Sequence, residues 1–137
     1  DGGAHVIVLG DFNDMPSDRS LRKVLQVKPY PSVASDCQPN ALYNLATAIT
    51  GEPPGSYFHA WRGNKEWKLY DQIIISGSLV NGEPIRFDGA FTVIAPDYMR
   101  YKGGKNKGAP LPTYGKHSRY LGGYSDHFPV GARFIYK

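Results

Sequence analysis

The stretch "HVIVLGDFND", residues 5–14, sets the expectations for the whole chain. Its first part, residues 5–10, is a short, almost continuous apolar run rich in β-branched residues, which is typical of a strand buried in a sheet. Asp11, Asn13 and Asp14 follow at once. Because open α/β sheets place their ligands beyond the strand ends, this polar loop is a candidate site.

Helical spacing of apolar residues predicts two helices after that loop. The first covers residues 19–27 and can be capped by Ser17 or Asp18. The second covers residues 40–49 and ends before Gly51. The proline-rich segment between these two helices is expected to be irregular.

The second half of the chain is dominated by strand signals. Apolar runs predict strands over residues 70–76, 85–94 and 128–136. A loop of unusual length, residues 95–123, separates the last two, and loops of that length are usually functional or mobile. Residues 59–67 are expected to form a second loop at the site. Strands gathered late in the chain predict a mixed, layered α/β architecture rather than a doubly wound one.

Length and composition describe a single globular domain. The chain has 137 residues, of which 41% are hydrophobic, and no apolar run has the length of a membrane span. The single cysteine, Cys37, cannot form an intrachain disulfide and is expected to be a small packed side chain, so a cytoplasmic and an exported protein both remain open. No signal peptide is recognisable, and the immediate start of strand-like sequence leads us to expect a piece of a longer protein.

Positive charge is concentrated in one segment. The formal net charge is +4, yet residues 100–119 carry six basic side chains and no acidic one. This basic loop is either a solvated loop or an electrostatic collar for an anionic substrate such as a phosphate ester or a nucleic acid. Five tyrosines in or beside it either stack on bases or pack the loop: Tyr98, Tyr101, Tyr114, Tyr120 and Tyr124.

The pair Asp11 and Asn13 suits phosphoryl chemistry. In extended backbone both side chains lie on one side, and Phe12 points into the core. A carboxylate can bind a hard cation or take a proton from water, and an amide can donate to a phosphate oxygen. The alternative is an Asx-rich turn that leads into a helix cap.

Two further groups of polar residues lie at the starts of predicted strands. Asp71 precedes the apolar run "QIIIS", where a carboxylate needs a partner, and its best use is to accept the Nδ1–H of a histidine. Asp126 and His127 stand together in "YSDHFPV", residues 124–130. The alternative for both groups is that they are exposed polar residues at the start of a strand and have no catalytic role.

Three motifs in this order resemble one known family. "VIVLGDFND", "GSY…W…YDQIIIS" and "GGYSDHFPV" look like the C-terminal half of the endonuclease/exonuclease/phosphatase superfamily, which includes exonuclease III-like and DNase I-like nucleases, inositol polyphosphate phosphatases and bacterial sphingomyelinases. The resemblance implies a four-layer α/β sandwich of two packed sheets. Residues 1–137 would be the C-terminal portion and half of that sandwich: a mostly antiparallel mixed sheet with helices on one face.

The resemblance also implies a role for each motif residue. Asp11 would orient or deprotonate the attacking water and bind metal, and Asn13 would contact the phosphate. His127 would contact the scissile phosphate, held by Asp71, and Asp126 would bind metal or water. The implied cofactor is Mg²⁺ or Mn²⁺.

One part of the family pattern has no counterpart here. The family's N-terminal half supplies a metal-binding glutamate, and Glu52, Glu66 and Glu83 do not lie in a similar motif. We therefore expect a metal-dependent phosphoesterase as part of a longer parent, with this chain alone inactive and able to self-associate through an uncovered sheet face. The alternative is a non-catalytic fragment that acts as a binding module.

The sequence does not decide the class of substrate, which could be a nucleic acid, a lipid headgroup or a phosphorylated small molecule. Trp61 and Arg62, in the expected loop at residues 59–67, and Lys105, in the basic loop, are candidate substrate contacts. Trp67 is expected to belong to the core.

Overall fold

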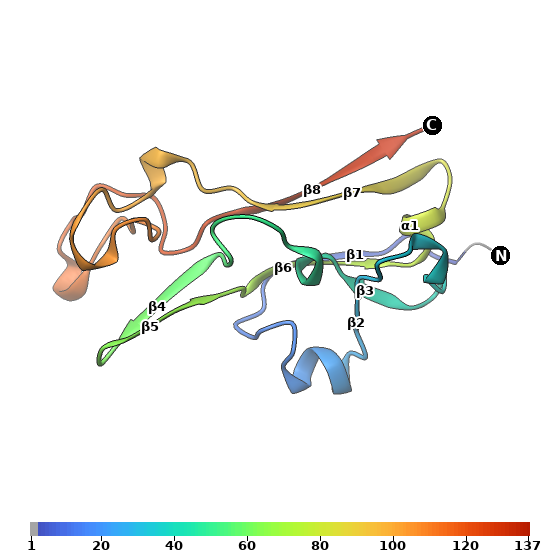
Figure 1. Ribbon diagram of the computed structural model, residues 1–137, viewed down its shortest axis with the longest axis horizontal. Coiled ribbons are helices and arrows are strands. Elements are labelled where there is room, and N and C mark those ends of the chain that lie inside the picture. Colours follow the sequence, from blue (N-terminus) through green and yellow to red (C-terminus); the bar gives the residue numbers. More distant parts are fainter. Residues whose placement is uncertain (1–2) are drawn as a thin grey trace.

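The computed structural model describes residues 3–137 and is built mainly from strands (Figure 1). The strands are β1 (Ile7–Asp11), β2 (Lys28–Pro29), β3 (Leu42–Asn44), β4 (Tyr57–Trp61), β5 (Asn64–Lys68), β6 (Asp71–Ser76), β7 (Ile85–Val93) and β8 (Val130–Tyr136). The helical segments are a π-helical turn, η1 (Ser20–Val24), an α-helical turn, α1 (Ser78–Asn81), and 3-10 turns η2 (Ala34–Asp36), η3 (Leu45–Ala48), η4 (Asp97–Met99), η5 (Gly104–Asn106) and η6 (Lys116–Ser118).

The predicted mixed and mostly antiparallel architecture is confirmed, whereas the helical layer is reduced to these turns. The main sheet has the order β1-β6-β3-β2, in which only β2 and β3 are parallel. Two antiparallel ribbons, β4-β5 and β7-β8, complete the strands of the described chain. None of the helices in residues 3–137 is long and apolar enough to cross a bilayer.

The central strand β6 has packed neighbours on both faces. Ile73 and Ile75 join the core cluster that contains Phe87 of β7, so the β7-β8 ribbon covers one face of the sheet. Ile74 points to the opposite face and packs with Leu21 of η1. Figure 1 shows these layers, with the β7-β8 ribbon above the sheet and η1 below it.

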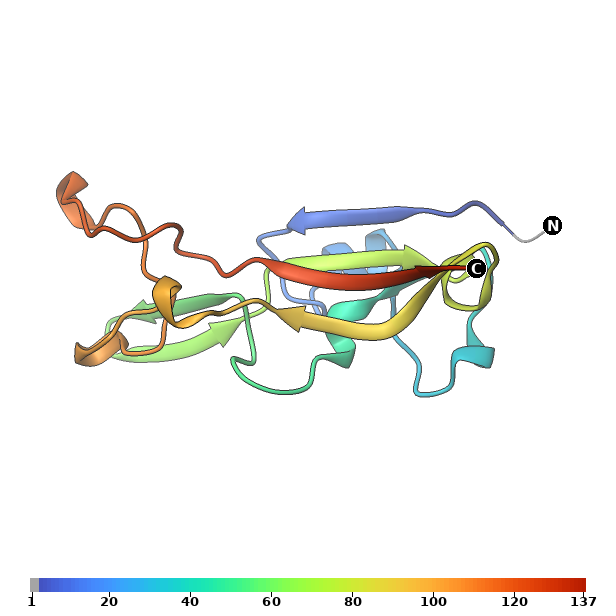
Figure 2. The same ribbon diagram turned by 90° about the horizontal axis from the view of Figure 1, so that it is seen from above.

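The expectation that residues 5–10 form a buried strand is wrong. The strand forms, but β1 is an edge strand paired only with β6, and all five of its residues are exposed. Leu9 is 68% exposed and Ile7 is 45% exposed. The reason lies in the arrangement of the layers, because β1 runs to one side of the β7-β8 ribbon (Figure 2) and only β6 pairs with it. An uncovered apolar surface is therefore a feature of this chain.

Both predicted helices are wrong in extent. The first shrinks to η1, in which Leu21 is buried but Val24 is 75% exposed. The polar residues before it are bound within the loop, since Asp18 accepts the Met15 N–H and so does not cap the turn. The second becomes β3 followed by η3, because residues 42–44 pair with the buried strand β6. Tertiary pairing outweighs helical spacing here.

The later strands agree closely with the sequence. β6, β7 and β8 lie within one to two residues of the predicted strands, and the predicted loop at residues 95–123 contains 3-10 turns and isolated β-bridges but no full strand. Residues 59–67 are not a loop but most of the β4-β5 hairpin. Its tip, Arg62 and Gly63, has positive φ at both residues, which is the pattern of a type I′ turn.

Candidate active site

The central feature of the site is the contact between Asp71 and His127. Asp71 begins β6, His127 lies just before β8, and the His127 Nδ1 is 2.7 Å from the Asp71 Oδ2. The two side chains are 20% and 18% exposed. The hydrogen bond predicted from the sequence is therefore present. Since Nδ1 faces the carboxylate, Nε2 is the ring nitrogen left for a substrate.

Ser56 binds the backbone beside both Asp71 and His127, and sequence analysis did not predict this role. It is fully buried, and its Oγ accepts the Asp71 N–H at 3.2 Å. Its carbonyl oxygen accepts the Phe128 N–H at 2.8 Å. One residue thus fixes the backbone on both sides of the Asp71–His127 bond. Ser56 lies in the quoted "GSY" motif, but the motif by itself does not show which backbone groups the serine contacts.

Aromatic rings support the imidazole. The ring of Tyr57 lies 4.7 Å from that of His127, and Tyr57 in turn stacks on Tyr70 at 5.6 Å. Tyr57 also pairs with His127 in an isolated antiparallel bridge. Trp67 packs on Phe128 at 6.1 Å, but it is only partly buried and belongs to neither core cluster, so the expectation of a core residue is met only in part.

Asp11 lies at the same end of the sheet. The register of β1 and β6 places it directly opposite Asp71, so both carboxylates are on one face with their Cβ atoms about 5 Å apart. Asn13 adopts positive φ, and its N–H donates to the Asp11 Oδ1 at 2.8 Å. Phe12 packs against the opposite face of the sheet, as predicted. That Asp11 and Asn13 open into the same cleft as His127 stays a prediction.

Two carboxylates that face each other repel unless a cation or a proton lies between them. The Asp11 carboxylate is exposed, and the hydrogen bonds it accepts in the structure come from Asn13. Together with the imidazole beside Asp71, this arrangement can orient a water molecule and bind a phosphate oxygen.

The described residues do not assemble a complete metal site. Asp126 is exposed and lines one surface hollow with Tyr114 and Tyr124 and another with Tyr57. Within residues 3–137 there is no group of three or more His, Cys, Asp or Glu side chains placed to hold a metal ion. The predicted metal roles of Asp11 and Asp126 therefore stay predictions.

The three predicted substrate contacts lie together but apart from His127. Trp61 and Arg62, at the end of β4 and the hairpin tip, line a pocket of about 560 Å³ with Lys105 of the basic loop. Not every cation of that loop is available to a ligand. Arg100 turns inward, where its Nε donates to the Ala95 carbonyl and its guanidinium lies over the Phe128 ring. It holds the loop against the core.

Cys37 is a packed side chain, as expected. It is buried in the main core cluster, and this burial raises the pKa of the thiol. A thiol in that state is a poor nucleophile at neutral pH.

Comparison with protein families identifies the family of this chain. The model of the endonuclease/exonuclease/phosphatase family matches residues 1–136, which is nearly the whole chain. Neither a curated protein nor a solved structure matches it.

Proposed function

Since the chain belongs to the endonuclease/exonuclease/phosphatase family, whose members generally hydrolyse phosphate esters with a divalent metal, we propose that it carries the histidine side of a phosphoesterase active site. The observation that supports this proposal is the 2.7 Å contact between His127 and Asp71, with Asp11 facing Asp71 across the sheet. A module that only binds has no need for an oriented imidazole beside two opposed carboxylates.

Each of these residues has a specific task in the proposed reaction. Asp71 orients the His127 ring, so that Nε2–H of the protonated imidazole donates to a phosphate oxygen and stabilises the charge that develops there. Asp11 orients the attacking water and accepts its proton. The Asn13 N–H donates to the Asp11 carboxylate, and we propose that its side-chain amide donates to the phosphate.

We propose Mg²⁺ or Mn²⁺ as the cofactor, which would neutralise phosphate charge when bound. Asp11 and Asp126 offer the carboxylate oxygens that hard cations prefer. Because residues 3–137 contain no three-ligand group, further ligands would come from outside these described residues. We therefore propose that residues 1–137 are the C-terminal portion of a longer domain, half of a four-layer sandwich, and that the chain alone is inactive.

The test compares this chain with a longer protein that contains it. Both are assayed with Mg²⁺ and with EDTA on an oligonucleotide, a phosphomonoester and a phospholipid headgroup ester. We expect EDTA-sensitive hydrolysis only from the longer protein. In it, His127→Ala and Asp11→Ala should each lower kcat by about a hundredfold or more. His117→Ala, which removes an exposed histidine of the basic loop, is the matched control and should have little effect.

Turnover by the 137-residue chain alone would contradict the incomplete site, and full activity of His127→Ala would contradict the assignment of the imidazole. A binding module is the second candidate function, favoured by the incomplete metal donor set within residues 3–137. It would be supported if the longer protein bound phosphate esters and hydrolysed none of them.

A further inference from the structure

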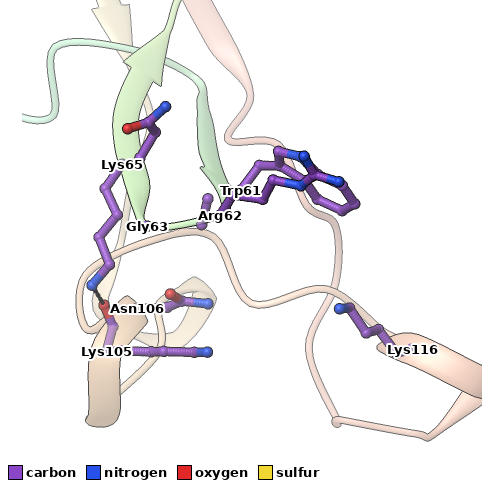
Figure 3. A pocket seen from close by; sticks show the side chains of 9 residues that line it. Trp61, Arg62, Gly63, Lys65, Lys105, Asn106 and Lys116 are labelled. Carbon is purple, nitrogen blue, oxygen red and sulfur yellow. Dashed lines mark hydrogen bonds between the residues drawn. The ribbon is translucent and has the colours of Figure 1, made fainter.

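The basic pocket lies between two segments that are distant in the sequence. The tip of the β4-β5 hairpin forms one wall and turns of the basic loop form the other. Its cations are Arg62 and Lys65 from the hairpin and Lys105 and Lys116 from the loop. Figure 3 shows Lys105 and Lys116 extending from the loop toward the same space as Trp61 and Arg62.

These four cations have no acidic partner. The pocket lining includes no Asp or Glu, and among residues 3–137 none of the four lies within ion-pair distance of a carboxylate. Lys65 donates to the Lys105 carbonyl, which joins the two walls. Four like charges that are held together without a counter-ion raise the local potential and favour binding of an anion.

The pocket also presents an aromatic platform. Trp61 is 59% exposed, which is unusual for so large an apolar ring, and the Arg62 guanidinium lies 5.8 Å from its centroid. An exposed indole beside cations is the combination that binds a base and its phosphate together. A phosphate alone needs only the cations. Asn106 also lines the pocket, and a side-chain amide there can form a hydrogen bond with a base or a sugar hydroxyl.

A second hollow lies beside the pocket and is lined in part by residues near the candidate active site. This hollow, of about 320 Å³, shares Asn106 and Lys116 with the pocket and is also lined by Tyr57 and Asp126. Tyr57 contacts His127. Along β4, Tyr57 and Trp61 are four residues apart, which is about 13 Å in a strand. A chain of a few nucleotides spans that distance.

We propose that this pocket is a nucleotide subsite, which binds a base on Trp61 and its phosphate on the surrounding lysines, a few nucleotides away from the phosphate at His127. The substrate is then a single-stranded nucleic acid or a single-stranded end. This inference rests on the proposed function for its second anchor at His127, but binding in the pocket itself requires neither metal nor turnover.

Binding by the 137-residue chain is therefore the test, in EDTA and without turnover. The fluorescence anisotropy of short labelled oligothymidylates is followed as the protein is added, with pyrophosphate as a competitor and anionic phospholipid vesicles tested separately by co-sedimentation. Trp61→Ala should weaken oligonucleotide binding at least about fivefold. Lys105→Ala and Lys116→Ala should weaken it several-fold and each lower the slope of log affinity against log salt by about 0.7. Lys107→Ala, an exposed loop lysine outside the pocket lining, is the matched control.

Three results would overturn the inference. One is an equal loss of binding in Lys107→Ala and Lys105→Ala, which means diffuse charge rather than a pocket. Another is pyrophosphate binding as tight as that of the oligonucleotide and insensitive to Trp61→Ala. The third is binding to vesicles but not to oligonucleotides, which assigns the pocket to a lipid surface. His127→Ala separates this inference from the proposed function, because it should abolish turnover of the longer protein while the weakening of oligonucleotide binding by Trp61→Ala and Lys105→Ala persists in the His127→Ala background.

Discussion

Ser56 offers the most direct test of how the site is held together. Ser56→Ala removes the acceptor of the Asp71 N–H and leaves that buried donor without its partner. An unsatisfied buried group costs about 1–3 kcal/mol, and the 3.2 Å distance places this bond toward the lower end. We expect a loss of about 1–2 kcal/mol in the free energy of unfolding.

Ser76→Ala is a matched control from the other end of β6. Ser76 is also buried, and its Oγ contacts the Val6 N–H, the Ala4 carbonyl and the Ser78 hydroxyl at 2.8–2.9 Å. Its loss should therefore cost at least as much stability. It lies five residues from Asp71, about 16 Å along the strand, so the site should not sense it.

The two variants are compared by urea unfolding and by the ¹⁵N resonances of the His127 ring, which is one of four histidines. Both should lose stability, but only Ser56→Ala should shift the His127 resonances, because only it loosens Asp71. The reasoning is refuted if the His127 signals are unchanged in Ser56→Ala, or if they move equally in both variants.

Two further predictions follow from burial. Leu9→Lys should weaken self-association of the chain, measured by analytical ultracentrifugation, at little cost in stability because Leu9 is exposed; the equally exposed Val24→Lys on η1 should not weaken it. Burial raises the pKa of the Cys37 thiol, so its contribution to stability is complete below pH 9.0 and lost as pH rises above that value. Urea unfolding from pH 8 to about 10.5 should show this loss, and Cys37→Ala should reduce it.

The sequence predicted the parts of the fold that are dictated by continuous apolar runs. Apolar runs predicted β6, β7 and β8. The contact between Asp71 and His127 could be predicted because each residue precedes one of these runs. Apolar character alone did not show whether a strand is covered. The run at residues 5–10 forms β1 at an exposed edge, and its exposure depends on which elements pack beside it.

The features that sequence reasoning missed depend on contacts between distant segments. Residues 42–44 have helical spacing but extend because β6 lies beside them. Trp61 and Lys116 share a pocket although 55 positions separate them, and nothing in the local sequence of either predicts the other. Ser56 is similar, because its role appears only when β6 and the segment before β8 meet on it.

An uncovered apolar surface and a carboxylate of the candidate site lie on the same strand. β1 leaves the apolar side chains of Ile7 and Leu9 exposed and ends at Asp11, the carboxylate that faces Asp71. Leu9 and Asp11 are two residues apart, or about 7 Å along a strand. Any segment that buries Leu9 therefore reaches Asp11 with its next residues, and can bring the acidic ligand that residues 3–137 do not supply. We expect completion of the core and completion of the site to be one event, so that stability and metal affinity rise together when β1 is covered.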